Sequence, residues 1–226
     1  MMIRTMRLVI FSVGVAVLTG CFGSPAINYY TLTAGGPQES AAPAAGGAAY
    51  SIAVGPVTLP EVVDRPQLVV RVGGNQVVLV DEHRWAEPLS SEIPRAIAGH
   101  LAQLLGTRQV SAYPSSASDE ADYRVFIDIQ RFDSELREAV TIDAIWTIRR
   151  PAQKDAPEKT GRSLVREAVG GNGYEALVSA HSRALAALSR DIAAAIRATD
   201  SAGAKTAPTP SPPPATPAPP ASAPAP

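Results

Sequence analysis

The sequence predicts an α+β domain: a mainly antiparallel sheet with two principal helices packed on one face. Residues 121–132 and 140–148 alternate apolar with polar side chains and are long enough to be neighbouring antiparallel strands. Residues 163–169 supply a third strand. Helical spacing of apolar residues recurs near residues 85–106 and 174–198, before and after these strands. Helices that flank such a run of strands pack together on one face of the sheet, which defines a single α+β domain.

Two shorter stretches add strands ahead of the first helix. Residues 51–57 are apolar but are interrupted at Gly55-Pro56, which predicts a strand with a break. Residues 67–72 and 76–80 are rich in valine, and the Gly73-Gly74-Asn75 segment between them tolerates turn conformations. This second pattern predicts a β-hairpin.

The first helix is expected to start near residues 85–88, with Pro88 in its first turn, where a missing N–H costs least. Pro94 inside the apolar pattern predicts a kink or a later start, and Gly106 predicts the end. The stripe that should face the sheet consists of Leu89, Ile93, Ile97, Leu101 and Leu104.

The second helix is expected over residues 174–198, with arginines and Asp191 on its solvent side. His181 falls on its apolar stripe, where a packed and hydrogen-bonded core histidine is a better interpretation than a metal ligand. The stripe consists of Leu177, His181, Leu185, Leu188, Ile192 and Ile196.

The first 20 residues have the features of a bacterial lipoprotein signal peptide. Arg4 and Arg7 form a positive start, and residues 8–18 form an apolar run shorter than the ~20 residues that a membrane-spanning helix needs. Leu18-Thr19-Gly20-Cys21 then fits the lipobox, in which the small residues give the signal peptidase access to the bond before the cysteine. We therefore expect cleavage before Cys21.

Cys21 is the only cysteine of the chain, so the mature domain has no disulfide. Its thiol is expected to carry diacylglycerol and its α-amine a further acyl chain such as palmitate. Each buried CH₂ group contributes about 0.8 kcal/mol, so two or three chains anchor firmly. Phe22 stands where aspartate would retain a lipoprotein in the inner membrane. The predicted location is the periplasmic face of a Gram-negative-type envelope, most consistent with the outer membrane.

Composition sets the domain boundaries and excludes one class of partner. A net charge of −1 argues against nucleic-acid binding, which calls for a basic surface. Residues 21–49 are expected to hold the lipidated N-terminus, a first short strand and a Gly/Ala/Pro-rich linker, and residues 50–199 the folded domain. Residues 200–226, rich in proline and alanine, are expected to be disordered.

The residues indicate no catalytic, cofactor or metal site. The histidines His83, His100 and His181 form no metal-binding pair, and there is no nucleophile elbow or phosphate loop. The acidic run at residues 119–122 reads as a solvated turn, and Glu82-His83-Arg84-Trp85 as a polar cap that leads into the first helix. An enzyme is therefore not expected, and the covalent lipid on Cys21 is the only attached group.

Several segments together resemble one family. After the lipobox come Asn28-Tyr29-Tyr30-Thr31-Leu32 and the segment over residues 52–60; the most specific parts are Asp64-Arg65-Pro66-Gln67-Leu68-Val69 and Trp85-Ala86-Glu87-Pro88-Leu89. Ala121-Asp122-Tyr123-Arg124-Val125 and the helix from Ala176 follow in the same order. Over residues 21–198 the chain resembles the ABC-type transport auxiliary lipoproteins, the PqiC/YmbA-like intermembrane transport lipoproteins.

The resemblance implies a non-catalytic role in moving lipid or other hydrophobic cargo between two membranes. It implies an MCE-domain protein with an ABC or membrane permease as partners, and a homo-oligomeric ring as one possible assembly. The alternative is a structural envelope lipoprotein whose C-terminal tail contacts peptidoglycan or wall-associated proteins. Whether the apolar helix faces also line a lipid-sized cavity is left open by the sequence.

Asp64, Arg65 and Trp85 are the candidates for a partner-facing surface, because charged and aromatic residues in loops commonly carry recognition. A structural interpretation stands beside this one. Asp64 and Arg65 would then fix the start of a strand, and Trp85 would cover the helix start as part of the core.

Overall fold

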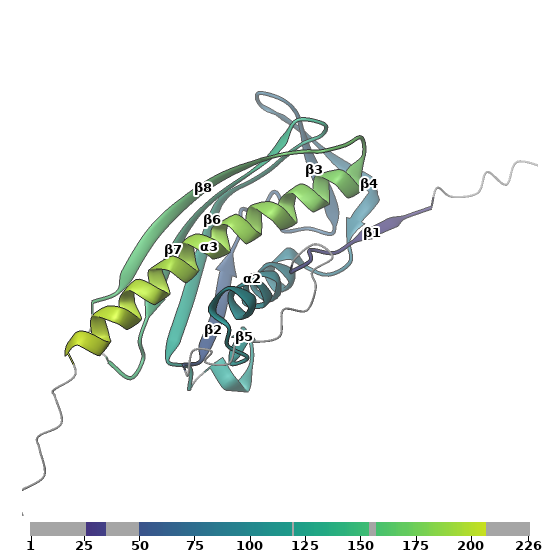
Figure 1. Cartoon of the computed structure of the whole chain (residues 1–226). Helices are drawn as coiled ribbons and strands as arrows, with labels where there is room; N and C mark the ends of the chain where they lie inside the picture. The colour runs from purple at the N-terminus through teal and green to yellow at the C-terminus, as the bar shows by residue number, and fades with distance from the viewer. Residues whose placement is uncertain (1–25, 35–49, 119, 154–156, 207–226) are drawn as a thin grey trace, which may run out of the picture.

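A computed structural model describes residues 26–34, 50–118, 120–153 and 157–206, and within α3 the side chains only as far as Ser201. The predicted signal peptide, Cys21, nearly all of the predicted linker and residues 207–226 lie outside this described part. Figure 1 shows the arrangement of the elements.

The larger sheet has five strands in the order β5-β2-β6-β7-β8. The long central ladders, β6 with β7 and β7 with β8, are antiparallel, whereas β2 runs parallel to both of its neighbours. The predicted break at Gly55-Pro56 is a register shift between Val54 and Val57 in the β2–β6 ladder. The strands are β2 (Ile52–Thr58), β5 (Val110–Ala112), β6 (Tyr123–Glu135), β7 (Ala139–Arg149) and β8 (Lys159–Ala168).

The smaller sheet has three strands in the order β1-β4-β3. The predicted hairpin is confirmed as β3 (Gln67–Gly73) antiparallel to β4 (Gln76–Trp85), and β1 (Asn28–Tyr30) runs parallel to β4. The expectation that residues 82–85 cap the first helix was wrong, because β4 continues through Trp85 and pairs there with Tyr30.

Two helices form the second layer. Helix α2 (Leu89–Leu105) starts one residue after Pro88, continues through Pro94 and ends at Gly106, whose φ of 66° is left-handed as a C-terminal cap requires. Helix α3 (Tyr174–Thr206) continues beyond the predicted end at Ala198. The first part of the segment that was expected to be disordered, residues 200–206, is therefore helical. In the described part of the chain, no helix is both long enough and apolar enough to cross a bilayer.

The core lies between the helices and one face of the larger sheet (Figure 1). The predicted stripes are buried except at Leu104, which is half-buried. Leu89, Ile93, Ile97 and Leu101 from α2 meet Leu177, Leu185, Leu188 and Ile192 from α3 over the inward side chains of β6 and β7. Burying each such side chain contributes about 1.5–3 kcal/mol. Because the sheet covers these stripes, they do not line an open cavity.

The α+β fold class and the single domain with two principal helices are confirmed. The antiparallel pairs follow the prediction, but the sheet is divided in two, and each part also contains parallel pairs.

Candidate functional site: the N-terminal strap and the hairpin cleft

The N-terminal segment of residues 26–34, which we call the strap, is bound to the domain along its length. Its first half pairs with β4 through the Asn28–His83 and Tyr30–Trp85 register. The Ala86 N–H donates to the Tyr30 carbonyl at 2.8 Å, so the strap also contacts the turn before α2. The strap thereby links the predicted lipid attachment point to the core.

The second half of the strap lies over the two helices. The Leu32 N–H donates to a Glu92 carboxylate oxygen at 3.0 Å on α2, and the Thr33 N–H donates to Ser182 Oγ at 3.3 Å on α3. Glu92 is almost fully buried, and burial raises the pKa of its carboxyl while the Leu32 N–H opposes that rise. Gly99 leaves the space that the strap needs, since an added Cβ there would lie 2.4 Å from the Ala34 Cβ.

An aromatic stack connects the strap with the start of α3. The Tyr30 hydroxyl and His83 Nδ1 are 2.7 Å apart, and the His83 ring stacks on Tyr174 with centroids 3.8 Å apart. The stack brings together β1, β4 and the first residue of α3, so the strap, the smaller sheet and α3 meet at one end of the molecule.

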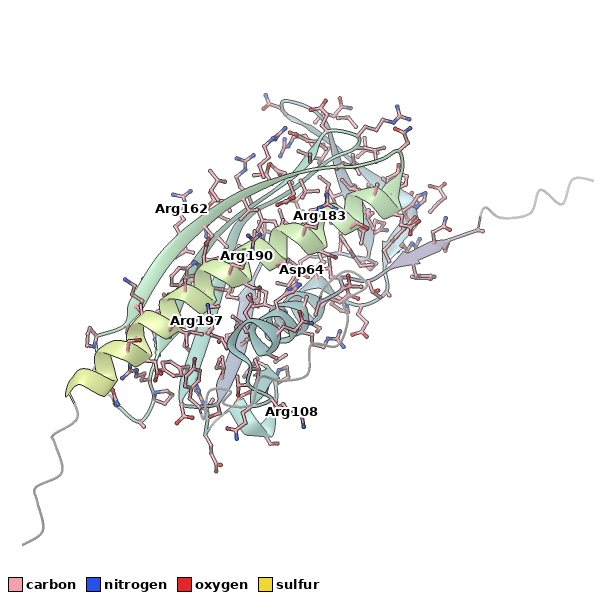
Figure 2. The ribbon with its side chains drawn as sticks, in the orientation of Figure 1. Asp64, Arg108, Arg162, Arg183, Arg190 and Arg197 are labelled. Atoms are coloured by element: carbon pink, nitrogen blue, oxygen red, sulfur yellow. The ribbon has the colours of Figure 1, made fainter. Side chains whose placement is uncertain are left out.

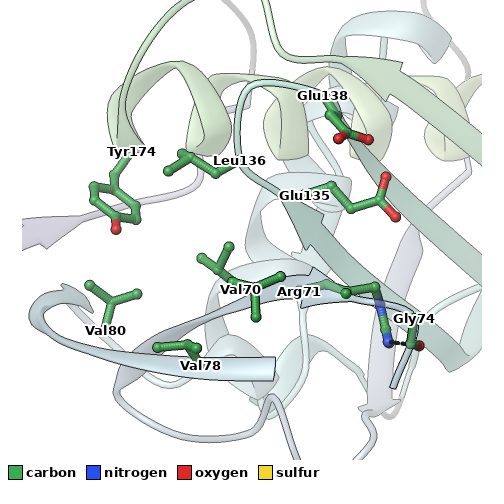
Figure 3. A pocket seen from close by; sticks show the side chains of 11 residues that line it. Val70, Arg71, Gly74, Val78, Val80, Glu135, Leu136, Glu138 and Tyr174 are labelled. Carbon is green, nitrogen blue, oxygen red and sulfur yellow. Dashed lines mark hydrogen bonds between the residues drawn. The ribbon is translucent and has the colours of Figure 1, made fainter. Parts of the chain in front are cut away.

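A cleft of about 490 Å³ opens beside this stack. Figure 3 shows it between the β3–β4 hairpin, the β6–β7 turn and the start of α3. Its apolar lining is Val70, Val72, Val78, Val80, Leu136 and Tyr174, and its charged lining is Arg71, Glu135 and Glu138. The cleft combines an apolar floor with charged edges of both signs.

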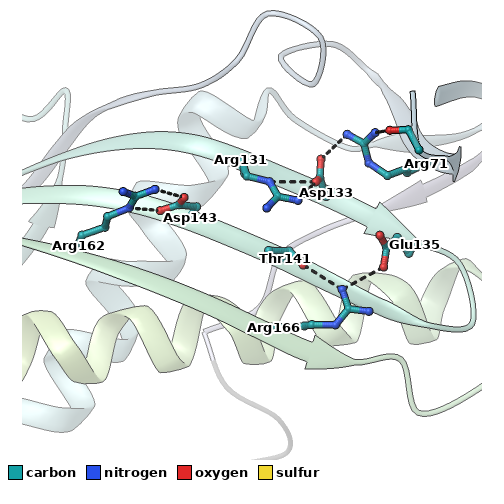
Figure 4. Close-up of polar contacts among 9 residues, drawn as sticks. Arg71, Arg131, Asp133, Glu135, Thr141, Asp143, Arg162 and Arg166 are labelled. Carbon is teal, nitrogen blue, oxygen red and sulfur yellow. Dashed lines mark hydrogen bonds and ion pairs between the residues drawn. The ribbon is translucent and has the colours of Figure 1, made fainter. Parts of the chain in front are cut away.

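An ion pair holds the hairpin to the larger sheet, and a second pair within β6 shares its carboxylate. Arg71 on β3 lies 3.0 Å from the Asp133 carboxylate on β6, and Arg131 approaches the same carboxylate at 2.6 Å (Figure 4). Burial alone would raise the pKa of Asp133, but the hydrogen bonds from Arg131 and Arg71 hold it below its ordinary range. The hairpin is therefore fixed at its β3 edge.

The same outer face of the larger sheet carries further pairs. Arg162 on β8 binds both carboxylate oxygens of Asp143 at 2.8 and 2.6 Å, and Arg166 reaches Glu135 at 3.1 Å (Figure 4). The Arg162 hydrogen bond holds the pKa of the Asp143 carboxyl below its usual range. Paired charges of opposite sign are typical of a face that meets water.

The structure separates the three predicted interface residues. Asp64 is exposed in the turn before β3 (Figure 2), and Arg65 is half-buried, with its Nη2 donating to the Glu61 carbonyl at 3.4 Å. Trp85, by contrast, is only 5% exposed, so its expected position on a partner-facing surface was wrong. Its ring meets Phe132 and His181 edge to face, which agrees with the structural interpretation.

His181 is a core residue, as its position on the apolar stripe predicts. Its Nε2 lies 2.8 Å from the Ser134 hydroxyl, and its ring stacks on Phe132 with centroids 4.2 Å apart. Burial lowers the pKa of the His181 imidazole to about 3. His100 is likewise buried, and burial lowers its pKa. Both side chains therefore serve packing.

A row of arginines lies along the exposed face of α3. The sequence analysis had assigned these arginines only to the solvent side of the helix. Arg183, Arg190 and Arg197 recur every seven residues and lie along the helix in Figure 2. Arg183 donates to the Ala168 carbonyl at 2.6 Å, and Arg197 hydrogen-bonds the Leu104 carbonyl. Two of the three thus also join α3 to neighbouring elements.

The geometry defines a class of protein. It is an α+β domain with an N-terminal strap bound across its helices, and its described residues include no group of three His, Cys, Asp or Glu side chains arranged to hold a metal ion. The model of the ABC-type transport auxiliary lipoprotein component matches residues 30–193. The chain therefore belongs to this family, which places it among membrane-attached lipoproteins that assist transporters.

Two solved structures share the fold. A protein from Xanthomonas campestris is 17% identical with a TM-score of 0.62, over 79% of this chain and 99% of the other. An uncharacterized protein is 18% identical with a TM-score of 0.59, over 76% of this chain and 99% of the other. No curated protein sequence matches the chain.

Proposed function

We propose that the chain is a periplasmic lipoprotein, acylated at Cys21, that acts without catalysis beside an MCE-domain protein and its ABC or membrane permease. In this role it assists the movement of lipid between the two membranes from the outer-membrane side. Family membership over residues 30–193 carries the proposal. The strap supports it, because its hydrogen bonds to Glu92 and Ser182 provide a firm connection between an acyl anchor and the domain.

The exposed turn at Asp64 and Arg65 stays the candidate partner contact. Trp85 supports this surface from below rather than touching a partner, since the backbone N–H of Trp85 donates to the Pro66 carbonyl at 2.7 Å directly after that turn. Assembly of several copies around an MCE tunnel is compatible with this role.

Lipid exchange in the native envelope tests the proposal. Newly made phospholipid is pulse-labelled, and its appearance in the outer and inner membranes is followed with and without the chain. Depletion should change the exchange rate in one direction, and the full chain should restore it. An exchange rate that is independent of the chain, with all related lipoproteins also absent, would reject a transport role.

A structural envelope role is the second candidate, because α3 ends at the side of the molecule opposite to the start of β1 (Figure 1). The described chain thus ends on the side away from the start of β1. Removal of residues 207–226 separates the two roles. A transport component lacking them should still restore lipid exchange, whereas a tail-dependent structural lipoprotein should lose its attachment to the cell wall.

A further inference from the structure

The first half of β4 is apolar on both of its faces, yet neither face is covered. Val77, Val78 and Leu79 are consecutive and all exposed, and Val72 across the hairpin is 57% exposed. Val78 points into the cleft, so Val77 and Leu79 point to the opposite face. A strand with one wet face alternates apolar and polar side chains, and a run of exposed apolar residues indicates a surface that meets something other than water.

The start of β1 extends this surface. Ile27 and Tyr29 are both exposed, and the Asn28–His83 register places them in the same sheet as the hairpin. Tyrosine is enriched where a membrane meets water, because its ring is apolar and its hydroxyl is wet. The smaller sheet therefore carries exposed aliphatic side chains on β4 and an exposed tyrosine on β1, a combination expected of a surface that approaches a bilayer.

The number of residues between Cys21 and β1 identifies the bilayer that this surface would contact. Cys21 precedes Asn28 by seven residues, which span at most about 25 Å when extended. Val77 precedes His83, the partner of Asn28, by six residues, or at most about 20 Å along β4. A membrane that holds acyl chains on Cys21 therefore lies within reach of both β1 and the hairpin.

We propose that the β3–β4 hairpin and the start of β1 form a membrane-seating surface that rests on the bilayer into which Cys21 is anchored. The proposal rests on the acylation of Cys21 in the proposed function. The anchor keeps this end of the molecule at the bilayer, so contact by the hairpin is in effect intramolecular. The tip of the hairpin enters the boundary between headgroups and acyl chains with both of its faces: Val77 and Leu79 on one face, and Val72 on the cleft face.

The polarity of β4 marks where the strand leaves the membrane. Gln76 to Val80 is followed at once by Asp81 and Glu82, both exposed. These carboxylates favour water, so they set the level of the headgroups and limit insertion to the hairpin. Helix α3 then leads away from the bilayer, because Tyr174 lies at the cleft and the helix ends at the opposite side of the molecule (Figure 1).

Site-directed fluorescence on the full lipidated chain tests the surface. Because Cys21 is the only native cysteine, acylation leaves an introduced cysteine as the single free thiol. Val77→Cys and Val72→Cys are labelled with an environment-sensitive probe in vesicles of phosphatidylethanolamine and phosphatidylglycerol. Leu164→Cys is the matched control, since Leu164 is 66% exposed on β8 and belongs to the larger sheet. Circular dichroism checks that each variant is folded.

The hairpin probes should show blue-shifted emission and several-fold stronger quenching by spin-labelled lipid than the Leu164→Cys probe, which should be quenched by aqueous iodide instead. Equal iodide quenching at all three positions would overturn the proposal. Protection from both quenchers would also overturn it and would assign the hairpin to a protein interface. Labelling of the chain without an introduced cysteine would mean that Cys21 is free and not acylated. That result would reject the acyl anchor of the proposed function, whereas the quenching results test the membrane-seating surface.

Discussion

Replacing Glu92 with alanine should loosen the strap while the domain stays folded. The Glu92 carboxylate accepts the Leu32 N–H at 3.0 Å, and Glu92 lies almost fully buried on α2. A hydrogen bond to a charged group contributes about 1.5–3 kcal/mol. The pairing of β1 with β4 does not depend on this carboxylate, so the loss should be confined to the second half of the strap.

Amide hydrogen exchange measures this loss directly. Removal of the acceptor should speed exchange at Leu32 and Thr33 by roughly ten- to hundred-fold, whereas amides of the core strands keep their protection. Glu87→Ala is the matched control: Glu87 is exposed near the same end of α2, and its carboxylate pairs with Arg95.

Two results would refute this reasoning. Unchanged exchange at Leu32 in the Glu92→Ala variant would mean that the carboxylate does not hold the strap. Equal acceleration in the Glu87→Ala variant would mean that the helix end, and not the specific hydrogen bond, controls the strap.

Three further predictions concern the domain. Gly161→Ala should lower the free energy of unfolding by about 1–3 kcal/mol in urea titration, because its Cβ would lie 2.2 Å from the Trp146 ring, whereas Gly73→Ala, with nothing within 4 Å, should cause little change. His181 has a pKa lowered from 6.5 to about 3 by burial, so the unfolded state binds its proton first. Stability should fall by up to about 5 kcal/mol as pH decreases from 6.5 towards 3, and His181→Gln should show a shallower fall. Deleting residues 207–226 should leave the melting temperature unchanged, and a drop of several degrees would show that they pack on the domain.

The sequence was most informative where the apolar repeat extended over many residues. Tyr123, Val125 and Ile127 recur at every second position, and all three face the core from the antiparallel β6–β7 ladder. Strand β1 has three residues, too few for a period, and its parallel partner β4 lies far along the chain. Parallel pairing between distant segments leaves no local signal, which is why the division into two sheets was not predicted.

Two errors have local causes. The charged residues before Trp85 suggested a polar approach to the helix, yet β4 continues through them and its pleat turns the Trp85 ring inward. Helix α3 extends beyond Ala198 because alanine and lysine favour helix and the first proline comes only at residue 208. The cleft could not be predicted, since its walls come from the hairpin, a turn and a helix start that only the fold brings together.

Co-purification tests the central claim most directly. The full lipidated protein is extracted from its native envelope in mild detergent, and the proteins that accompany it are identified by mass spectrometry. A Cys21→Ser variant, which cannot receive the thioether-linked lipid, serves as the control for attachment. An MCE-domain protein together with its permease should be recovered with the acylated chain. Reproducible recovery of wall-associated proteins without any MCE-domain protein would contradict the proposed function and favour the structural role.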